Sequence, residues 1–244
     1  MVPRGCRLRV AVFAAWVAVA LWSSPARADT ADDEHTYQTW MALFAHGPLK
    51  GNLWLWSDVQ LRLYESFEPT TVILRPGLTW RVTPSLFLTA GYGWTPGWAR
   101  TEGDRSWGDL TFVDEHRAWQ QVLWAPVDPA TGVAAQVRVR FEQRFRPGSS
   151  DVGARLRVLW RGQAPISRNR LWMVVVWNEL FVAAQDTDWG QRAGFDQNRA
   201  FVGFARQVLP AKLRLEAGYQ NKWTIRQGPD TIDHILALSL FLTW

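Results

Sequence analysis

The last residues of the chain constrain its fold more than any other stretch. From Leu236 to Trp244 every second residue is large and apolar, and the final residue is aromatic. Alternation with a period of two is typical of a β-strand that has one apolar face. A tilted strand of about 9–11 residues is long enough to cross a lipid bilayer. The pattern therefore predicts a closing transmembrane β-strand over residues 234–244.

The opposite end of the chain has the features of a secretory signal. Basic residues precede an apolar run from Val10 to Trp22, and Ala26 and Ala28 supply the small side chains that a signal peptidase requires. An N-terminal membrane anchor is the alternative, but this run is short for a helix, which needs about 20 residues to span. We predict a cleaved signal peptide over 1–28.

Removal of this signal changes the chemistry that the chain can carry. Its one cysteine, Cys6, lies inside the signal, so a mature chain would have no disulfide, thiolate nucleophile or cysteine-ligated metal. Four of the 27 basic residues and none of the 22 acidic residues leave with it, which makes 23 against 22. The mature protein therefore has no basic excess, and we expect no nucleic-acid partner.

Alternating segments recur along the rest of the chain, each with one apolar face and one polar or small face. They are separated by turn residues, as in barrels and sandwiches. The segment 36–46 is weakly patterned and 111–124 is ambiguous in phase. The predicted strands are 36–46, 52–63, 71–82, 86–94, 111–124, 135–145, 152–161, 170–183, 195–208, 213–222 and 234–244.

The connections between these segments alternate in length. Turns at 83–85, 128–132 and 209–211 are short, whereas the polar connections at 95–110, 184–194 and 226–232 are mostly longer. Outer-membrane barrels combine short periplasmic turns with longer outer loops. Single-chain bacterial barrels have an even number of strands, so the eleven segments predict ten strands if the first is partial, or twelve if one is missed.

We therefore predict an all-β fold, an antiparallel up-and-down transmembrane β-barrel of 10–12 strands. Its organisation is a signal over 1–28, a short N-terminal segment over 29–35, and one barrel domain over 36–244. The 17 tryptophans agree with this fold, because indole rings gather at membrane–water interfaces. Sugar-stacking platforms in a secreted or periplasmic soluble carbohydrate-binding β-protein are the alternative explanation for them.

The polar faces of the predicted strands are rich in arginine. The residues expected to face the lumen are Asp58, Arg62, Arg75, Arg81, Arg138, Arg140, Glu142, Arg144, Arg155, Arg157, Arg161, Glu179, Arg199, Arg214, Glu216 and Lys222. Arginine keeps its charge and must find acceptors. One hypothesis is a structural network of ion pairs that fills a narrow barrel, with Glu179 and Arg199 as a cross-strand pair. The other is a narrow anion-leaning pore, since the basic residues outnumber the acidic ones.

An outer-membrane lipid-modifying enzyme is a third hypothesis, and the sequence offers little for it. The histidines are His35, His46, His116 and His234, and no G-x-S-x-G motif occurs. Asp114-Glu115-His116 is the densest cluster of catalytic residue types, but it lacks a nucleophile. The acidic residues around 102–114 match no calcium-loop motif. We therefore expect no catalytic residue, cofactor or metal ligand.

Several short motifs carry a family resemblance. They are Asp58-Val59-Gln60-Leu61-Arg62, Glu115-His116-Arg117, Asn178-Glu179-Leu180-Phe181, Gly194-Phe195-Asp196-Gln197-Asn198-Arg199, Gly203 and Glu216-Ala217-Gly218-Tyr219. Together with the closing strand, they make residues 36–244 resemble the domain-of-unknown-function 2490 family. The resemblance implies a bacterial outer-membrane barrel without an assigned activity, and it transfers no catalytic residue.

The closing strand also resembles the C-terminal strand of bacterial outer-membrane barrels in general. In those proteins the terminal aromatic residue belongs to the signal that the insertion machinery reads. The resemblance implies that Leu240, Leu242 and Trp244 form a membrane-insertion signal. It also implies the partners, which would be outer-membrane lipid, lipopolysaccharide and the barrel insertion machinery.

Overall fold

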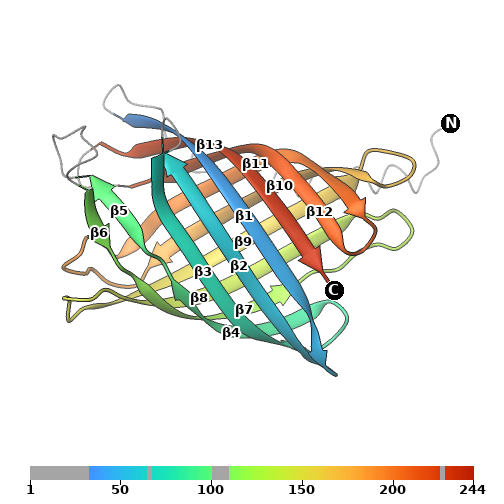
Figure 1. Ribbon diagram of the computed structural model, residues 1–244, viewed down its shortest axis with the longest axis horizontal. Helices are drawn as coiled ribbons and strands as arrows, with labels where there is room; N and C mark the ends of the chain where they lie inside the picture. The colour runs from blue at the N-terminus through green and yellow to red at the C-terminus, as the bar shows by residue number, and fades with distance from the viewer. Residues whose placement is uncertain (1–32, 65–67, 101–109, 226–228) are drawn as a thin grey trace.

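The computed structural model describes residues 33–64, 68–100, 110–225 and 229–244. In this part of the chain every regular element is a β-strand, and no helix there is long and apolar enough to cross a membrane. The strands form one twisted sheet that closes on itself as a barrel (Figure 1). The predicted signal 1–28, with Cys6, lies outside the described residues.

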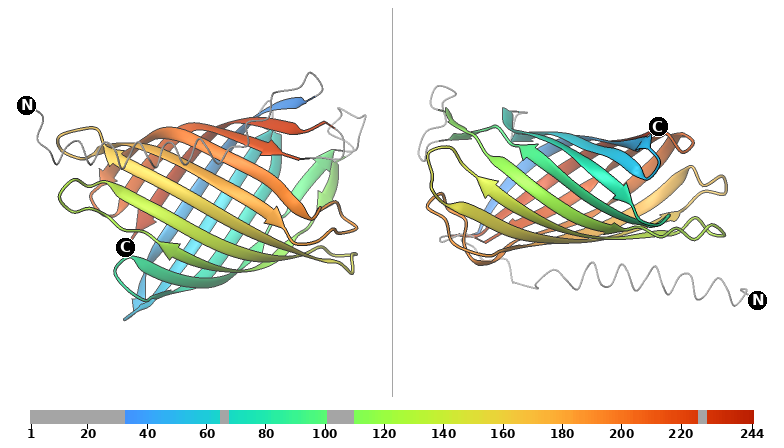
Figure 2. Two further views of the ribbon diagram at one scale, coloured as in Figure 1. Left: turned by 180° about the vertical axis from the view of Figure 1, so that it is seen from behind. Right: turned by 90° about the horizontal axis from the view of Figure 1, so that it is seen from below.

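Thirteen strands make up the sheet, and eleven of them form the closed ring. Their bounds are β1 Glu34–Lys50, β2 Leu53–Tyr64, β3 Glu68–Arg81, β4 Leu86–Trp94, β5 Gly97–Arg100, β6 Leu110–Val113, β7 His116–Trp124, β8 Ala134–Phe145, β9 Val152–Pro165, β10 Trp172–Ala183, β11 Gly194–Leu209, β12 Leu213–Thr224 and β13 Thr231–Thr243. The short β5 and β6 pair with each other outside the ring, where β5 also contacts β3. This hairpin lies at the end of the barrel opposite the C-terminus (Figures 1 and 2).

The ring closes through a parallel pair of strands. Neighbouring strands of the ring run antiparallel except at the seam, where β1 lies parallel to β13 with Glu34 opposite Thr231 and His46 opposite Thr243. An odd number of strands in an up-and-down chain brings the first and last strands together in the same direction. The predicted all-β barrel is confirmed, but the expectation of an even strand number is wrong, because β1 is a complete strand paired on both sides.

The ambiguous segment 111–124 is two strands. β6 ends at Val113 and β7 begins at His116, so Asp114 and Glu115 interrupt the pairing between them. Two strands with different phases cannot fit one alternating pattern. The predicted loop 95–110 likewise contains β5.

The outward-facing side chains of the ring are apolar and exposed. The closing strand shows the alternation, since Ile235 is fully buried while Leu236, Leu238, Leu242 and Trp244 are exposed. The other strands contribute exposed residues of the same kind, among them Leu78, Trp80, Leu88, Val122, Trp124, Val139, Phe141, Val202, Phe204 and Leu215. An exposed apolar surface on this scale is typical of a site of interaction with another protein or with a membrane.

Two cross-strand pairs of glycines make room for aromatic rings inside the barrel. Gly203 on β11 lies opposite Gly218 on β12, and a Cβ at Gly218 would be 2.6 Å from the ring of Phe201. Gly77 on β3 lies opposite Gly91 on β4, and a Cβ at Gly77 would be 2.7 Å from the ring of Trp119. The small inner-face residues therefore leave space for the rings that fill the lumen.

Candidate functional site in the barrel interior

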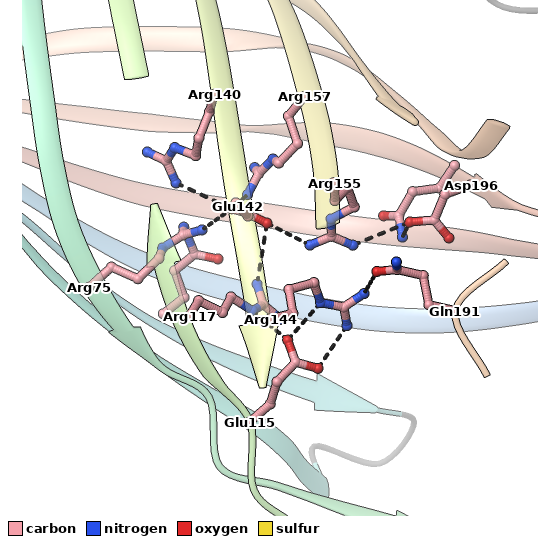
Figure 3. A network of polar contacts seen from close by, with 12 residues as sticks. Arg75, Glu115, Arg117, Arg140, Glu142, Arg144, Arg155, Arg157, Gln191 and Asp196 are labelled. Atoms are coloured by element: carbon pink, nitrogen blue, oxygen red, sulfur yellow. Dashed lines mark hydrogen bonds and ion pairs between the residues drawn. The ribbon is translucent and has the colours of Figure 1, made fainter. Parts of the chain in front are cut away.

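Polar side chains of distant strands meet inside the barrel. Arg161 on β9 pairs with Glu216 on β12, although two strands separate them in the sheet. Arg75 on β3 comes within 4.0 Å of Glu142 on β8, again across two intervening strands. Such contacts are possible only through the lumen, and Figure 3 shows the part of the polar interior that lies around Glu142 and Glu115.

The structure places all sixteen residues that were expected to face the lumen in buried or half-buried positions. The buried ones are Asp58, Arg75, Arg140, Glu142, Arg144, Arg155, Arg157, Arg161, Glu179, Arg199 and Glu216. The half-buried ones are Arg62, Arg81, Arg138, Arg214 and Lys222. Burial of this many guanidinium groups requires partners, because an unpaired charge is costly away from water.

Glu142 is the centre of the network, and its side chain is 0% exposed. Its two carboxylate oxygens accept hydrogen bonds from Arg157 at 2.5 Å and from Arg155 at 2.8 Å. Three further guanidinium groups lie within 4.0 Å of it, those of Arg75, Arg117 and Arg140 (Figure 3). One carboxylate therefore holds five arginines from four strands together.

Glu115 forms a second centre at the end of the barrel where the long loops lie. It accepts hydrogen bonds from Arg117 at 2.5 Å and from Arg144 at 2.7 and 2.8 Å. Burial alone would raise the pKa of the Glu115 carboxyl, but the charges of these two arginines outweigh burial and hold that pKa well below its ordinary value. Glu115 is therefore ionised at neutral pH and bridges β7 to β8.

The loop between β10 and β11 closes over this second centre. The Gln191 side chain is buried and accepts a hydrogen bond from Arg144 at 3.0 Å. The Trp189 ring lies 4.7 Å from the guanidinium carbons of both Arg144 and Arg146. The loop thus adds an aromatic and an amide partner that cover the network from one end.

The expected pairing of Glu179 with Arg199 is wrong. The two residues are direct cross-strand neighbours on β10 and β11, but Glu179 binds Arg138 at 2.7 Å and Arg157 at 2.8 Å. Arg199 instead donates to the Gln197 side chain at 2.7 and 3.0 Å. Cross-strand pairing identifies which residues share a face of the sheet. The long arginine side chains, however, bind acceptors on other strands across the lumen.

The remaining interior is filled by aromatic rings and by a separate ion pair. Trp56 and Trp119 meet edge to face at 5.1 Å, and the Arg140 guanidinium lies 4.4 Å from the Trp119 ring. Stacking of this kind stabilises a cation without a carboxylate. Nearer the C-terminal end, Arg161 and Glu216 pair, as noted above.

Sequence reasoning missed several interior residues. Arg117 and Glu115 were not assigned to the lumen, because the segment 111–124 was treated as one strand. A strand that begins at His116 would put Arg117, Trp119 and Gln121 on one face, as the structure does. Asp233 was missed because it precedes the predicted start of the closing strand, although it alternates correctly with Ile235.

The cluster Asp114-Glu115-His116 is divided between the two faces of the barrel. Glu115 faces the interior, whereas His116 is 3.2 Å from Asp114 and shares a hydrogen bond with the Tyr92 hydroxyl on the outer face. On β12 and β13, Tyr219 and His234 form a second pair of this kind at 2.7 Å. Both pairs lie on ring strands at the end opposite the C-terminus.

Across the described ranges, no cluster of three or more histidine, cysteine, aspartate or glutamate side chains has a geometry suited to a metal ion. The acidic side chains that do gather in the interior have arginines as their neighbours.

Comparisons with known proteins place the chain among proteins without an assigned activity. A family model described as "Protein of unknown function (DUF2490)" matches residues 37–233. An uncharacterised protein of Methylorubrum extorquens, strain AM1, is 34% identical over 212 residues, which cover 85% of this chain and 87% of that protein. No solved structure matches the chain.

Proposed function

The chain belongs to the DUF2490 family, and on that premise we propose that it is an integral β-barrel of a bacterial outer membrane whose lumen is closed by its own side chains. The observation that carries this proposal is the inversion of polarity. Exposed apolar residues cover the outside, and paired charges fill the inside. A soluble β-sandwich has the opposite arrangement, with an apolar core between its sheets.

Aromatic residues near both ends of the barrel support a membrane-spanning position. Exposed Trp80, Trp124, Trp172 and Trp244 lie near the end that holds the C-terminus, and Tyr37, Tyr92 and Tyr219 lie toward the other end. His234 on β13 and Trp244, the residue that follows β13, are ten positions apart. With a rise of about 3.3 Å per residue and a tilt of about 45°, they are separated by roughly 23 Å along the barrel axis. This matches the apolar band of about 25 Å in outer-membrane barrels.

The buried network supports a closed barrel over an open pore. Asp58, Arg140 and Glu142 are 0% exposed, so no water contacts these charged side chains. The charged side chains of an open aqueous pore would remain in contact with water. The interior therefore suits a structural role, in which ion pairs replace the apolar core that a small soluble protein would have.

A narrow anion-leaning pore is the second candidate. It is favoured by the excess of arginine over carboxylate in the interior, which would attract anions. Arg62 and Arg199 in particular have aromatic neighbours where other arginines have carboxylates. Conduction would require the network around Glu142 to open.

Fractionation tests the location. We expect the protein to stay with outer membranes after washing with high salt and urea, and to enter solution only with detergent. On gels it should migrate differently before and after heating, because a folded barrel resists unfolding by detergent. Removal of Trp244 should lower the amount assembled in the membrane, if that residue belongs to the insertion signal. Recovery of wild-type protein in the soluble periplasmic fraction would contradict the proposal and favour the carbohydrate-binding alternative.

Conductance of the refolded protein in planar bilayers separates the two candidates. A closed barrel is expected to give no discrete steps, and heat-modifiable migration of the same sample shows that it is folded. Steps with an anion-selective reversal potential in a salt gradient would instead support the pore. In that case we expect Arg62→Gln and Arg199→Gln to lower the selectivity.

A further inference from the structure

Two arginines from different strands lie over one indole ring inside the barrel, and a lysine lies beside one of them. The guanidinium carbon of Arg62, on β2, lies 3.8 Å from the centre of the Trp40 ring on β1. The guanidinium carbon of Arg199, on β11, lies 5.1 Å from the same ring. Lys222 on β12 is the cross-strand partner of Arg199. The closed ring of strands thus brings three cations to one side of the lumen.

Arg62 lacks the hydrogen bonds that a buried guanidinium requires. Among the residues described, its guanidinium forms no hydrogen bond or ion pair, and its Nε is buried without a partner. The Trp40 ring stabilises the positive charge through its face, but it cannot accept the five N–H donors in the guanidinium plane. A buried donor without a partner calls for an explanation, such as a bound ion.

The neighbours of Arg62 leave a local excess of positive charge. Lys222 pairs with Asp233, which also accepts a hydrogen bond from Thr36 at 2.5 Å. Arg199 is satisfied by the neutral Gln197 side chain. Glu179, the cross-strand neighbour of Arg199, is already bound by Arg138 and Arg157, so the charge of Arg62 has no carboxylate partner of its own among the described residues.

We propose that Arg62, Arg199 and Lys222 form a binding site for a small tetrahedral dianion of the phosphate or sulfate class. Two planar guanidinium groups and an ammonium group suit an acceptor with several oxygens, because each guanidinium can donate two parallel hydrogen bonds to it. An anion would also compensate the charge of Arg62. The ligand is a free ion, because the site lies inside the closed ring of strands.

Partial exposure makes this site reachable. Arg62 is half-buried and the Lys222 side chain is 15% exposed, whereas Glu142 at the centre of the network is 0% exposed. An ion can therefore approach the cations around Trp40 without disrupting the ion pairs around Glu142.

Isothermal titration of the refolded full-length protein in detergent tests the site. Inorganic phosphate and sulfate are the probes, and acetate at matched ionic strength is the comparison. We expect wild-type protein to bind one phosphate or sulfate per chain, and more tightly than acetate. Arg62→Gln should weaken phosphate binding at least tenfold, because it removes one positive charge and the paired N–H donors of the guanidinium group. Arg62→Lys keeps the charge but loses the paired N–H donors of the guanidinium group, and it should weaken binding by at least threefold.

Arg81→Gln is the matched control. Arg81 also stacks on an indole, with its guanidinium carbon 5.6 Å from the Trp54 ring, but it lies on β3 near the end that holds the C-terminus. Its replacement should leave phosphate affinity unchanged. Folded wild-type protein that binds phosphate and sulfate no better than acetate would overturn the site, as would equal affinities in Arg62→Gln and Arg81→Gln. The assay uses neither a membrane nor conductance, so its outcome is independent of the proposed location and role.

Discussion

Glu142→Gln is expected to prevent the barrel from refolding or to lower its stability severely. The substitution keeps the size of the side chain but removes the charge that holds Arg155 and Arg157 at 2.8 and 2.5 Å. Removal of one partner from a buried ion pair typically costs about 3–5 kcal/mol, because the other charge stays buried and uncompensated. Since three more arginines lie within 4.0 Å, we expect the upper end of this range.

Urea-dependent unfolding in detergent micelles, followed by tryptophan fluorescence, measures this effect. Glu34→Gln is the control, because Glu34 is an exposed residue at the start of β1. The double variant Glu142→Gln, Arg157→Gln should recover part of the lost stability, since it removes a cation together with the carboxylate. Glu179 would keep Arg138 as its partner in that variant. An unfolding midpoint of Glu142→Gln equal to that of wild type would refute the central role of this residue.

Gly218→Val is expected to disrupt the pairing of β11 with β12. A Cβ at Gly218 would lie 2.6 Å from the Cα of Gly203 and 2.6 Å from the Phe201 ring. The first of these atoms is backbone and cannot move without separating the strands. Overpacking typically costs about 1–3 kcal/mol, and a backbone clash in a closed ring places this substitution at about 3 kcal/mol or more.

Ala217→Val provides the matched control for this position. Ala217 is the adjacent residue on β12, and its side chain is exposed on the outer face. Both variants carry a valine, on opposite faces of one strand, although Gly218→Val also adds the Cβ that alanine already has. We expect the unfolding midpoint of Ala217→Val to lie close to that of wild type. A similar loss in both variants would mean that strand propensity, and not the inner-face contact, determines the effect.

The sequence alone was sufficient for the fold class and for the positions of the strands. Ten of the eleven expected strands are present and the segment 111–124 is divided into two, because a barrel strand with an apolar outer face and a polar inner face must alternate apolar and polar residues. The same alternation placed Asp58, Arg140 and Glu142 on one side of their strands, and these residues are fully buried in the structure. Periodicity carries this information locally, in a single strand, without reference to any partner.

Only the tertiary structure decided how the strands close and which charges meet. The parallel seam of β1 with β13 depends on the total strand number, which no single segment encodes. The partners of Glu179 are Arg138 and Arg157, because strand tilt and barrel curvature bring inner faces together across the lumen. The orphan guanidinium of Arg62 is visible only in this arrangement. Local chemistry determines the face on which a side chain lies, and the geometry of the closed barrel determines its neighbours.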